Sequence, residues 1–430
     1  MIFSALSLHP SLQKALDSCG YKQMTRIQEQ AIIPARRGKD LLASAQTGTG
    51  KTAAFSIPIL QQISDKPKAT IPCNTRALIL TPTRELTEQV ANAVKRYAQF
   101  LPIRITALYG GTKTSAQEKK LKAGNDIIVA TPRRLREHLE QGNIKLSNVE
   151  FVVLDEADRM LDMGFISDVY SLLQKTQKKR QTLLFSATLS QAVKELANKL
   201  LVNHQTIGEA KQNAIADTIE HVVYAVEEQR KTDLFMDLFG EHNWFKVLVF
   251  TSTKAQADNL MKRLKPAGIR IAICHGDKTQ GARRRAIADF KSDKVQILIA
   301  TEVAARGLDI QGLDYVINYN LPYLAEDYVH RIGRCGRAGQ PGQAISFVSR
   351  EEERALHNIE HIIGDNIKRI EIPTYTVADR KGIFKKLEQR RKPPRQHKDS
   401  RTKIARGEKN SLAKTKNKTG NNNTKRKRKK

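Results

Sequence analysis

The chain has 430 residues, of which 40% are hydrophobic and 27% charged, and its formal net charge at neutral pH is +30. These values predict a globular protein of two or three domains. No apolar run is long enough to span a bilayer, and Met1–Pro10 lacks the pattern of a signal peptide, so we expect a cytoplasmic protein without a membrane partner. The cysteines form no CxxC pair, which disfavours a zinc site or a disulfide framework.

The first two hundred residues alternate short apolar runs with amphipathic stretches. Helical periodicity is found, for example, at Thr83–Phe100 and Ser190–Leu201. Nearly continuous apolar runs predict buried parallel strands at Asp40–Ala43, Ala77–Leu80, Arg104–Leu108, Asp126–Ala130, Phe151–Leu154 and Thr182–Phe185. This alternation predicts a doubly wound α/β sheet that binds ligands at the carboxyl ends of its strands.

A second alternating series follows and predicts a second α/β lobe in tandem with the first. Helices are predicted at Lys254–Leu264, Gln280–Phe290 and Glu351–Ile363. Strands are predicted at His221–Val226, Lys246–Phe250, Arg270–Cys274, Val295–Ala300, Tyr315–Asn318 and Ala344–Val348. The polar segment 204–218 has no periodicity and is predicted to link the two lobes.

A glycine-containing loop follows the first predicted strand. Before the helix that begins near Lys51 stands the sequence Ala45-Gln46-Thr47-Gly48-Thr49-Gly50-Lys51-Thr52. Such loops turn backbone N–H groups toward phosphate, and the helix dipole adds to this attraction. The pattern predicts an ATP site in which Lys51 reaches the β- and γ-phosphates and Thr52 holds Mg²⁺. Ala45 stands where the general pattern has glycine, and an ordinary Gly/Thr turn is the alternative for the loop alone.

Two carboxylates end the apolar strand Phe151–Leu154. Asp155 is placed to coordinate Mg²⁺, mostly through water, and Glu156 to orient and deprotonate the attacking water. Acidic residues also favour helix N-termini, so a solvated helix cap is the alternative. The phosphate loop upstream favours the catalytic interpretation.

A pair of arginines in the second lobe can supply positive charge to this site. Arg334 and Arg337 stand three apart, on one face of a turn. Such a pair can reach a γ-phosphate held by the other lobe, as arginine fingers do, and hydrolysis would then require closure of the lobes. A basic surface helix is the alternative for this segment alone.

Together these segments resemble the DEAD-box ATP-dependent RNA helicases over about Phe3–Ile372. The resemblance implies two tandem RecA-like domains at 30–205 and 219–372, with a Q-motif segment at 1–29, a linker at 206–218 and a basic tail at 373–430. Tyr21 and Gln28 match the Q motif, in which the glutamine reads the adenine edge of ATP. Phe3 resembles the aromatic residue upstream of that motif, and Met24 replaces the family's usual proline.

The resemblance also assigns residues of the first lobe to RNA and to coupling. Ser186 and Thr188 match the segment that couples the ATP state to RNA, and Asp158 and His330 are expected to meet across the cleft. The family usually has glycine where Arg133 stands. The residues that match RNA contacts are Pro82, Thr83, Arg84, Gly110, Gly111, Thr131, Pro132 and Arg134.

In the second lobe Gln280, Arg283 and Thr301 match RNA contacts, and Asp309 matches the residue that holds the ATP ribose. Glu302 replaces the usual aspartate and Cys335 the usual threonine, two changes that we expect function to survive. The segment 275–283 is most similar to the bacterial RhlE-type branch. Contacts of these kinds read RNA backbone and shape, so little sequence specificity is expected.

The positive charge is concentrated at the C-terminus, where Asp379–Lys430 contains 22 Lys and Arg against 4 Asp and Glu. Few apolar residues accompany them, which predicts a largely disordered tail that adds affinity for RNA. Basic tails can also serve solubility alone, and the final run 425–430 would be a nuclear signal in a eukaryote.

The expected partners are single-stranded and duplex RNA, bound by a monomer, with ribosome assembly, mRNA decay and cold adaptation all open as pathways. Two other functions remain. A DNA helicase on the same two-lobe core is disfavoured by the Q motif and the RNA-type segments of the first lobe. A non-catalytic RNA clamp would have lost Lys51, Glu156 or Arg337, and all three are present.

Overall fold

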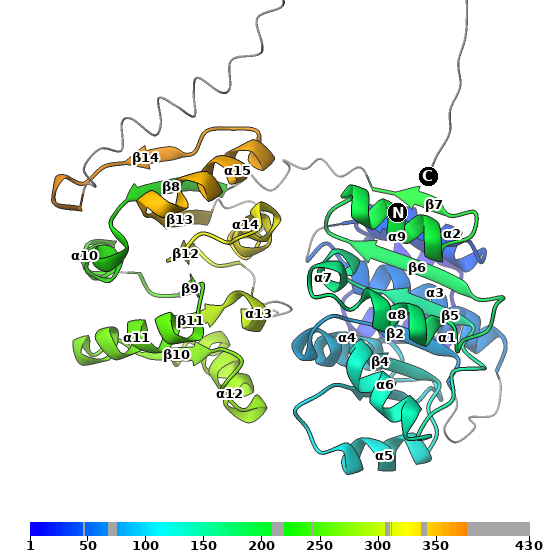
Figure 1. Cartoon of the computed structure of the whole chain (residues 1–430). Coiled ribbons are helices and arrows are strands. Elements are labelled where there is room, and N and C mark those ends of the chain that lie inside the picture. The colour runs from blue at the N-terminus through cyan, green and yellow to red at the C-terminus, as the bar shows by residue number, and fades with distance from the viewer. Residues whose placement is uncertain are drawn as a thin grey trace, which may run out of the picture. The chain divides into compact units, whose positions relative to one another are not determined.

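The computed structural model describes residues 1–45, 48–67, 75–208, 219–242, 244–305, 310, 312–336 and 342–375. Four residues of the predicted site, namely Gln46, Thr47, Asp309 and Arg337, lie outside this described part, as do segment 209–218 and the tail from 376 onward. The described residues form two α/β lobes, lobe 1 (residues 3–208) and lobe 2 (residues 219–375) (Figure 1).

Lobe 1 is built on a parallel sheet with the strand order β3-β4-β2-β5-β6-β1-β7. β1 and β5 both pair with β6 in parallel, so the phosphate loop after β1 and the acidic segment after β5 both follow carboxyl ends of strands and lie on the same side of the lobe. The strands are β1 (Leu41–Ser44), β2 (Ala77–Leu80), β3 (Ile105–Leu108), β4 (Ile127–Ala130), β5 (Phe151–Leu154), β6 (Gln181–Ser186) and β7 (Gln205–Ile207).

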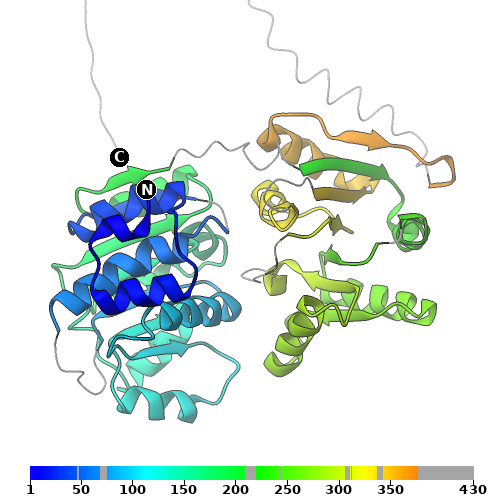
Figure 2. The same cartoon turned by 180° about the vertical axis from the view of Figure 1, so that it is seen from behind.

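Helices cover both faces of this sheet because alternate strand residues point to opposite sides. Leu41 and Ala43 pack with a first group of helices, drawn in blue in Figure 2. Leu42 packs with a second group on the opposite face. The first group is α1 (Pro10–Ser18), α2 (Arg26–Arg36), α3 (Lys51–Asp65) and α4 (Arg84–Tyr97). The second group is α6 (Pro132–Glu140), α7 (Ala157–Asp162), α8 (Ile166–Leu173) and α9 (Gln191–Leu200), while α5 (Thr114–Lys122) lies near the β3 edge.

Lobe 2 repeats the plan with the strand order β10-β11-β9-β12-β13-β8-β14. Its strands are β8 (Ile219–Ala225), β9 (Val247–Thr251), β10 (Ile271–Cys274), β11 (Ile297–Thr301), β12 (Tyr315–Asn318), β13 (Gly342–Val348) and β14 (Lys368–Ile370). The helices are α10 (Lys231–His242) and α11 (Lys254–Leu264) on one face, and α12 (Gln280–Lys291), α13 (Glu302–Ala305), α14 (Ala325–Ile332) and α15 (Glu353–Ile363) on the other. The prediction of two tandem RecA-like sheets is confirmed.

Two edge strands were not predicted. β7 pairs with β1, and β14 pairs with β8. Both have three residues and show too little alternation to be recognised alone. The linker prediction that started at residue 206 was therefore wrong for Thr206 and Ile207, because the sheet edge and the buried side chain of Ile207 hold them in β7.

Among the described residues, no helix combines the length and the apolar character that a membrane span requires. Cys19, Cys274 and Cys335 are free thiols, and Cys73 lies outside the described residues. Burial raises the pKa of the Cys335 thiol to about 12, so this thiol stays protonated at neutral pH.

Candidate ATP and RNA site

The phosphate loop ends in two glycines with left-handed backbone. Gly48 has φ 87° and Gly50 has φ 93°, a region that residues with a side chain rarely enter, and α3 starts directly afterwards at Lys51. The Lys51 side chain is buried, and its Nζ has no hydrogen-bond partner among the described residues. A buried ammonium without an acceptor is costly, so this loop suits an anionic ligand.

Asp155 lies opposite Lys51 and is equally unsatisfied. Its Oδ1 is buried without a hydrogen-bond partner in the described chain. Burial raises the pKa of Asp155 to about 7, the ammonium of Lys51 opposes that rise, and Glu156 adds to it. A buried carboxylate of this kind fits a site for a divalent cation.

Glu156 has a strained backbone. Its φ of 55° and ψ of 53° place a residue with a side chain in the left-handed region, immediately before α7. Such conformations persist where the surrounding structure enforces them, and they cluster at functional sites. The sharp turn allows a strand that ends in Asp155 to be followed at once by a helix that contains Asp158.

Gln28 reaches the phosphate loop from α2. Its Nε2 donates to the carbonyl of Gly50 at 3.2 Å, while its Oε1 accepts from the amide of Thr25 at 2.9 Å. Tyr21 packs edge-on against Phe3 and shares a 2.7 Å hydrogen bond with Tyr97. The structure therefore brings Gln28 to the phosphate loop, while Tyr21 is held by Phe3 and Tyr97.

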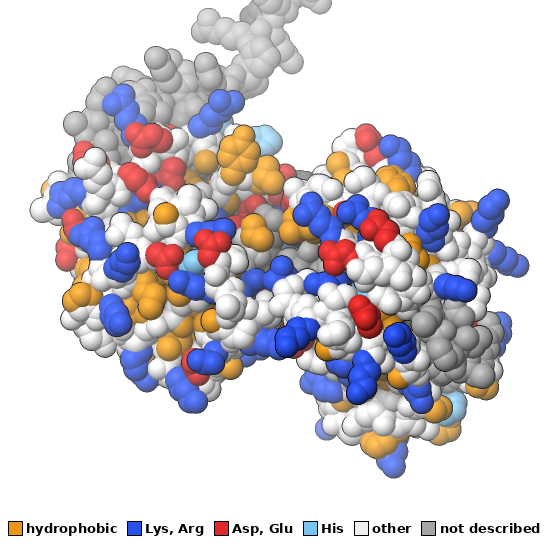
Figure 3. Space-filling model, turned by 60° about the horizontal axis from the view of Figure 1, so that its bottom comes forward, with side chains coloured by type: hydrophobic (Ala, Val, Ile, Leu, Met, Phe, Trp, Pro, Cys, Tyr) orange, Lys and Arg blue, Asp and Glu red, His pale blue; other side chains and the backbone are white. Residues whose placement is uncertain are grey.

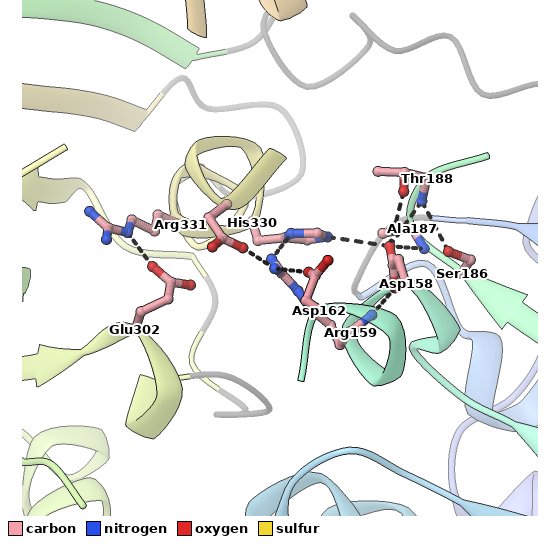
Figure 4. Close-up of polar contacts among 10 residues, drawn as sticks. Asp158, Arg159, Asp162, Ser186, Ala187, Thr188, Glu302, His330 and Arg331 are labelled. Atoms are coloured by element: carbon pink, nitrogen blue, oxygen red, sulfur yellow. Dashed lines mark hydrogen bonds and ion pairs between the residues drawn. The ribbon is translucent and has the colours of Figure 1, made fainter. Parts of the chain in front are cut away.

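Asp158 ties the acidic segment to the end of β6 (Figure 4). Its Oδ2 accepts from the amides of Ala187 and Thr188, both at 3.1 Å, and from the Thr188 hydroxyl at 3.3 Å. The Thr188 amide also donates to the Ser186 hydroxyl at 3.3 Å. These bonds connect α7 directly to Ser186–Thr188, and the assignment of these residues to coupling stays a prediction.

Arg159 links the two lobes. It is buried, and it donates to Asp162 in its own lobe at 3.1 Å and to Asp327 of α14 in lobe 2. It also contacts Nδ1 of His330 (Figure 4). Because a guanidinium only donates, Nδ1 accepts, and the neutral imidazole carries its proton on Nε2.

That Nε2 lies 4.0 Å from Asp158 Oδ2. The expected meeting of His330 with Asp158 is therefore a near approach, and the direct contact between the lobes is made through Arg159. Sequence reasoning missed Arg159 and Asp327. The sequence signal that could have identified Arg159 is its place directly after Asp155–Asp158, a segment in which three of four residues are acidic.

The predicted arginine pair is only half described. Arg334 is buried just after α14, and Arg337 lies outside the described residues. The α14 helix is held by Arg331, which donates to Asn318 at 3.1 Å, to the carbonyl of Asn320 at 2.7 Å and also to Glu302. Glu302, which replaces the family's usual aspartate, thus still reaches an arginine of α14 (Figure 4).

Most residues predicted to contact RNA lie around one cavity of about 360 Å³. The guanidinium of Arg84 lies against Gly110 and Gly111, and Gly111 has a φ of 78°, a backbone conformation that residues with a side chain rarely adopt. Lys and Arg side chains are prominent on the face drawn in Figure 3. The lining residues are Pro82, Thr83, Arg84, Glu85, Gly110, Thr131, Arg133, Arg134, Glu137, Met163, Phe165, Gly276, Arg283 and Val303.

Glu85 gathers the predicted RNA-facing residues of α12. Its Oε1 accepts from Gln280 at 3.0 Å and lies 2.9 Å from Arg283 Nη2. Sequence reasoning did not single out Glu85. Thr301, buried at the end of β11, and Pro132, buried at the start of α6, do not line the cavity.

Comparison with known proteins agrees with this geometry. A family model described as "DEAD/DEAH box helicase" matches residues 25–196, and one described as "Helicase conserved C-terminal domain" matches residues 230–339. The ATP-dependent RNA helicase CshA of Limosilactobacillus reuteri is 39% identical over 374 residues, covering 87% of this chain and 74% of its own. RhlB of Pseudomonas aeruginosa, strain UCBPP-PA14, is 42% identical over 370 residues, covering 85% and 93%.

Solved structures agree as well. S. cerevisiae Dbp5 bound to RNA and ADP BeF3 has a TM-score of 0.77 and 31% identity, covering 90% of this chain and 99% of that one. Mss116p bound to ssRNA and AMP-PNP has a TM-score of 0.77 and 29% identity, covering 86% and 80%. The two relatives from Limosilactobacillus reuteri and Pseudomonas aeruginosa are named CshA and RhlB, so they do not select the RhlE-type branch. The chain belongs to the DEAD-box family of ATP-dependent RNA helicases.

Proposed function

We propose that ATP binding closes the two lobes on single-stranded RNA, separates short duplexes locally and remodels ribonucleoproteins. The observation that carries this mechanism is the buried link from Arg159 to Asp327 and His330, directly beside Asp155 and Glu156. Asp158 also holds Ser186–Thr188, and the next residue, Arg159, contacts lobe 2. A change at the nucleotide would therefore reach lobe 2 through these two adjacent residues.

The residues present fit ATP with Mg²⁺. Lys51 would meet phosphate oxygens. Gln28, which contacts the phosphate loop at Gly50, would bind the adenine edge. Thr52 and Asp155 would hold Mg²⁺, which would neutralise charge on the phosphates. No group of three or more His, Cys, Asp or Glu with metal-ligating geometry occurs among the described residues. Mg²⁺ usually keeps several waters and is bound by one or two carboxylates together with substrate phosphates, so this sparse donor set suits it.

Lobe 2 would complete the site on closure. We assign Arg334 and Arg337 to the γ-phosphate, where guanidinium groups stabilise the charge of the transition state. Asp309 would hold the ribose. Glu156 would take a proton from the attacking water. Because the two arginines come from lobe 2, hydrolysis would proceed only when both lobes are engaged.

Substitution Glu156→Gln tests this assignment. The amide keeps the size of the side chain but cannot accept the proton, so ATP binding should survive while turnover falls by about 100-fold or more. A fluorescent ATP analogue measures binding, and phosphate release with saturating oligouridylate measures turnover. Retained turnover would overturn the role given to Glu156.

The RNA partner is supported by the relatives and by the cavity that gathers Thr83, Arg84, Gly110 and Thr131. These groups bind backbone and shape, so the core would read little sequence. Comparing stimulation of ATP hydrolysis by single-stranded RNA and by DNA separates this function from a DNA helicase. Equal stimulation would favour the second candidate, whose support is only the shared two-lobe architecture.

The tail would add affinity without specificity. Truncation after Tyr375, whose buried ring packs in lobe 2 and whose hydroxyl donates to Asp237, should preserve RNA-stimulated hydrolysis while weakening RNA binding at moderate salt, because each phosphate neutralised on a single strand contributes about 0.7 to the salt slope. Equal affinities and equal slopes for the two forms would exclude a role for the tail. The RhlE-type branch, a monomeric state, a cytoplasmic setting and a role in ribosome assembly or mRNA decay remain proposals from the sequence.

A further inference from the structure

Arg133 is exposed and yet held in place. Its side chain is 67% exposed, and its guanidinium carbon lies 5.0 Å from the centroid of the Phe165 ring. Asp168 Oδ2 is 3.8 Å from its Nε. Phe165 and Asp168 are both buried, so the two groups that orient Arg133 are fixed parts of lobe 1. A guanidinium stacked on an aromatic ring loses little freedom when it binds a ligand.

The hydrogen-bonding capacity of Arg133 is not used within the described chain. None of its N–H groups donates a hydrogen bond there, and its contact with Asp168 is a long ion pair. Asp168 is already engaged, because Arg136 donates to its Oδ1. The neighbouring Arg134 is different, since it donates to Thr114 at 2.7 Å and lies 3.3 Å from Glu137.

Arg133 lines the cavity of about 360 Å³ together with other guanidiniums and the carboxylates of Glu85 and Glu137, and Glu85 pairs with Arg283 Nη2 at 2.9 Å. Arg84, on the same cavity, donates no hydrogen bond within the described residues. Arg283 is buried, and its Nε has no hydrogen-bond partner there. A phosphate group has oxygens on several sides and matches the paired donors of arginine, so it suits this cavity.

We propose that Arg133 binds an RNA phosphate and so adds one contact to those that the family resemblance implies. The proposal rests on the RNA helicase function. One face of the guanidinium is covered by Phe165, which leaves its donor edge for phosphate oxygens. Arg84 from α4 and Arg283 from α12 would contact the same RNA strand. The family's usual glycine at position 133 has no side chain with which to make this contact.

The test measures RNA affinity against salt for the full-length chain and its variants Arg133→Gln, Arg133→Lys and Arg136→Gln. The probe is a fluorescein-labelled oligouridylate, read by fluorescence anisotropy in the presence of ADP and beryllium fluoride. Loss of one phosphate contact should lower the slope of log Kd against log salt by about 0.7 in Arg133→Gln. Arg133→Lys keeps the charge and should keep the slope.

Arg136→Gln is the matched control, because Arg136 shares Asp168 but does not line the cavity. Its slope should equal that of the unmodified chain. An unchanged slope in Arg133→Gln, or an equal decrease in Arg136→Gln, would show that Arg133 is only a surface ion pair and would overturn the proposal. Thermal unfolding midpoints establish that each variant is folded. Failure of the unmodified chain to bind the oligouridylate would instead count against the RNA function itself.

Discussion

Breaking the Arg159–Asp327 contact should uncouple ATP from RNA. Asp327→Asn keeps the shape of the side chain and the start of α14 but removes the charge that faces a buried guanidinium. The side chains of Arg159 and Asp327 are only 3% and 6% exposed, so water screens this pair poorly. The contact joins two lobes, so its loss acts on closure and leaves each lobe's own core intact.

The magnitude follows from the chemistry of the pair. A hydrogen bond to a charged group contributes about 1.5–3 kcal/mol, and removing one partner of a buried pair costs about 3–5 kcal/mol. Arg159 retains Asp162 at 3.1 Å, which places the expected loss nearer 2–3 kcal/mol, or about 30- to 150-fold in an equilibrium constant. Couplings between two ligand sites are typically about 1–3 kcal/mol, so most of the coupling should disappear.

The assay compares RNA affinity with and without a non-hydrolysable ATP analogue. The ratio of the two dissociation constants is the coupling, and Asp327→Asn should bring it close to one. Asp162→Asn is the control, because it removes the partner of Arg159 that lies in the same lobe, and it should change the ratio by less than about threefold.

A double-mutant cycle with Arg159→Gln then isolates the pair. The two substitutions should be strongly non-additive, since either one alone already breaks the contact. Additive effects, or a normal ratio in Asp327→Asn, would refute the view that this contact carries closure.

Two further substitutions follow from other contacts. Asp40 is buried and accepts from the amides of Thr182 at 2.8 Å and Val202 at 2.7 Å, so Asp40→Asn loses one acceptor and should lower the free energy of unfolding by about 1.5–3 kcal/mol in urea denaturation. Unchanged stability would show that these bonds contribute little. A Cβ at Gly50 would lie 2.3 Å from Nε2 of Gln28 in a backbone of φ 93°, so Gly50→Ala should weaken ATP binding by about tenfold or more, as nucleotide titration would show. An unchanged ATP affinity would contradict the place given to Gln28.

The sequence determined the elements that carry long or strongly patterned signals. The central strands were predicted within one or two residues, because parallel strands that are buried on both faces are apolar throughout. The phosphate loop and the acidic segment were also recognisable, since glycines, a lysine and paired carboxylates at strand ends have few other uses. The family followed from the order and spacing of these segments.

The tertiary structure decided the features that depend on chain segments far apart in sequence. β7 and β14 are strands only because neighbouring strands pair with them, and Ile207 becomes core only when that pairing is made. Arg159 meets Asp327 across 168 positions, and Glu85 meets Gln280 across 195. The local sequence pattern contains no information on contacts between residues so far apart in the sequence.

The acidic segment shows the division most clearly. The sequence placed Asp155 and Glu156 at a strand end and assigned them to metal and water. The structure added the left-handed backbone at Glu156, the bonds from Asp158 to β6 and the contact of Arg159 with lobe 2. Residue type and spacing determine which chemistry a segment can perform. Which partners hold that segment depends on packing between lobes, because buried charges are stable only where the fold supplies their counterparts.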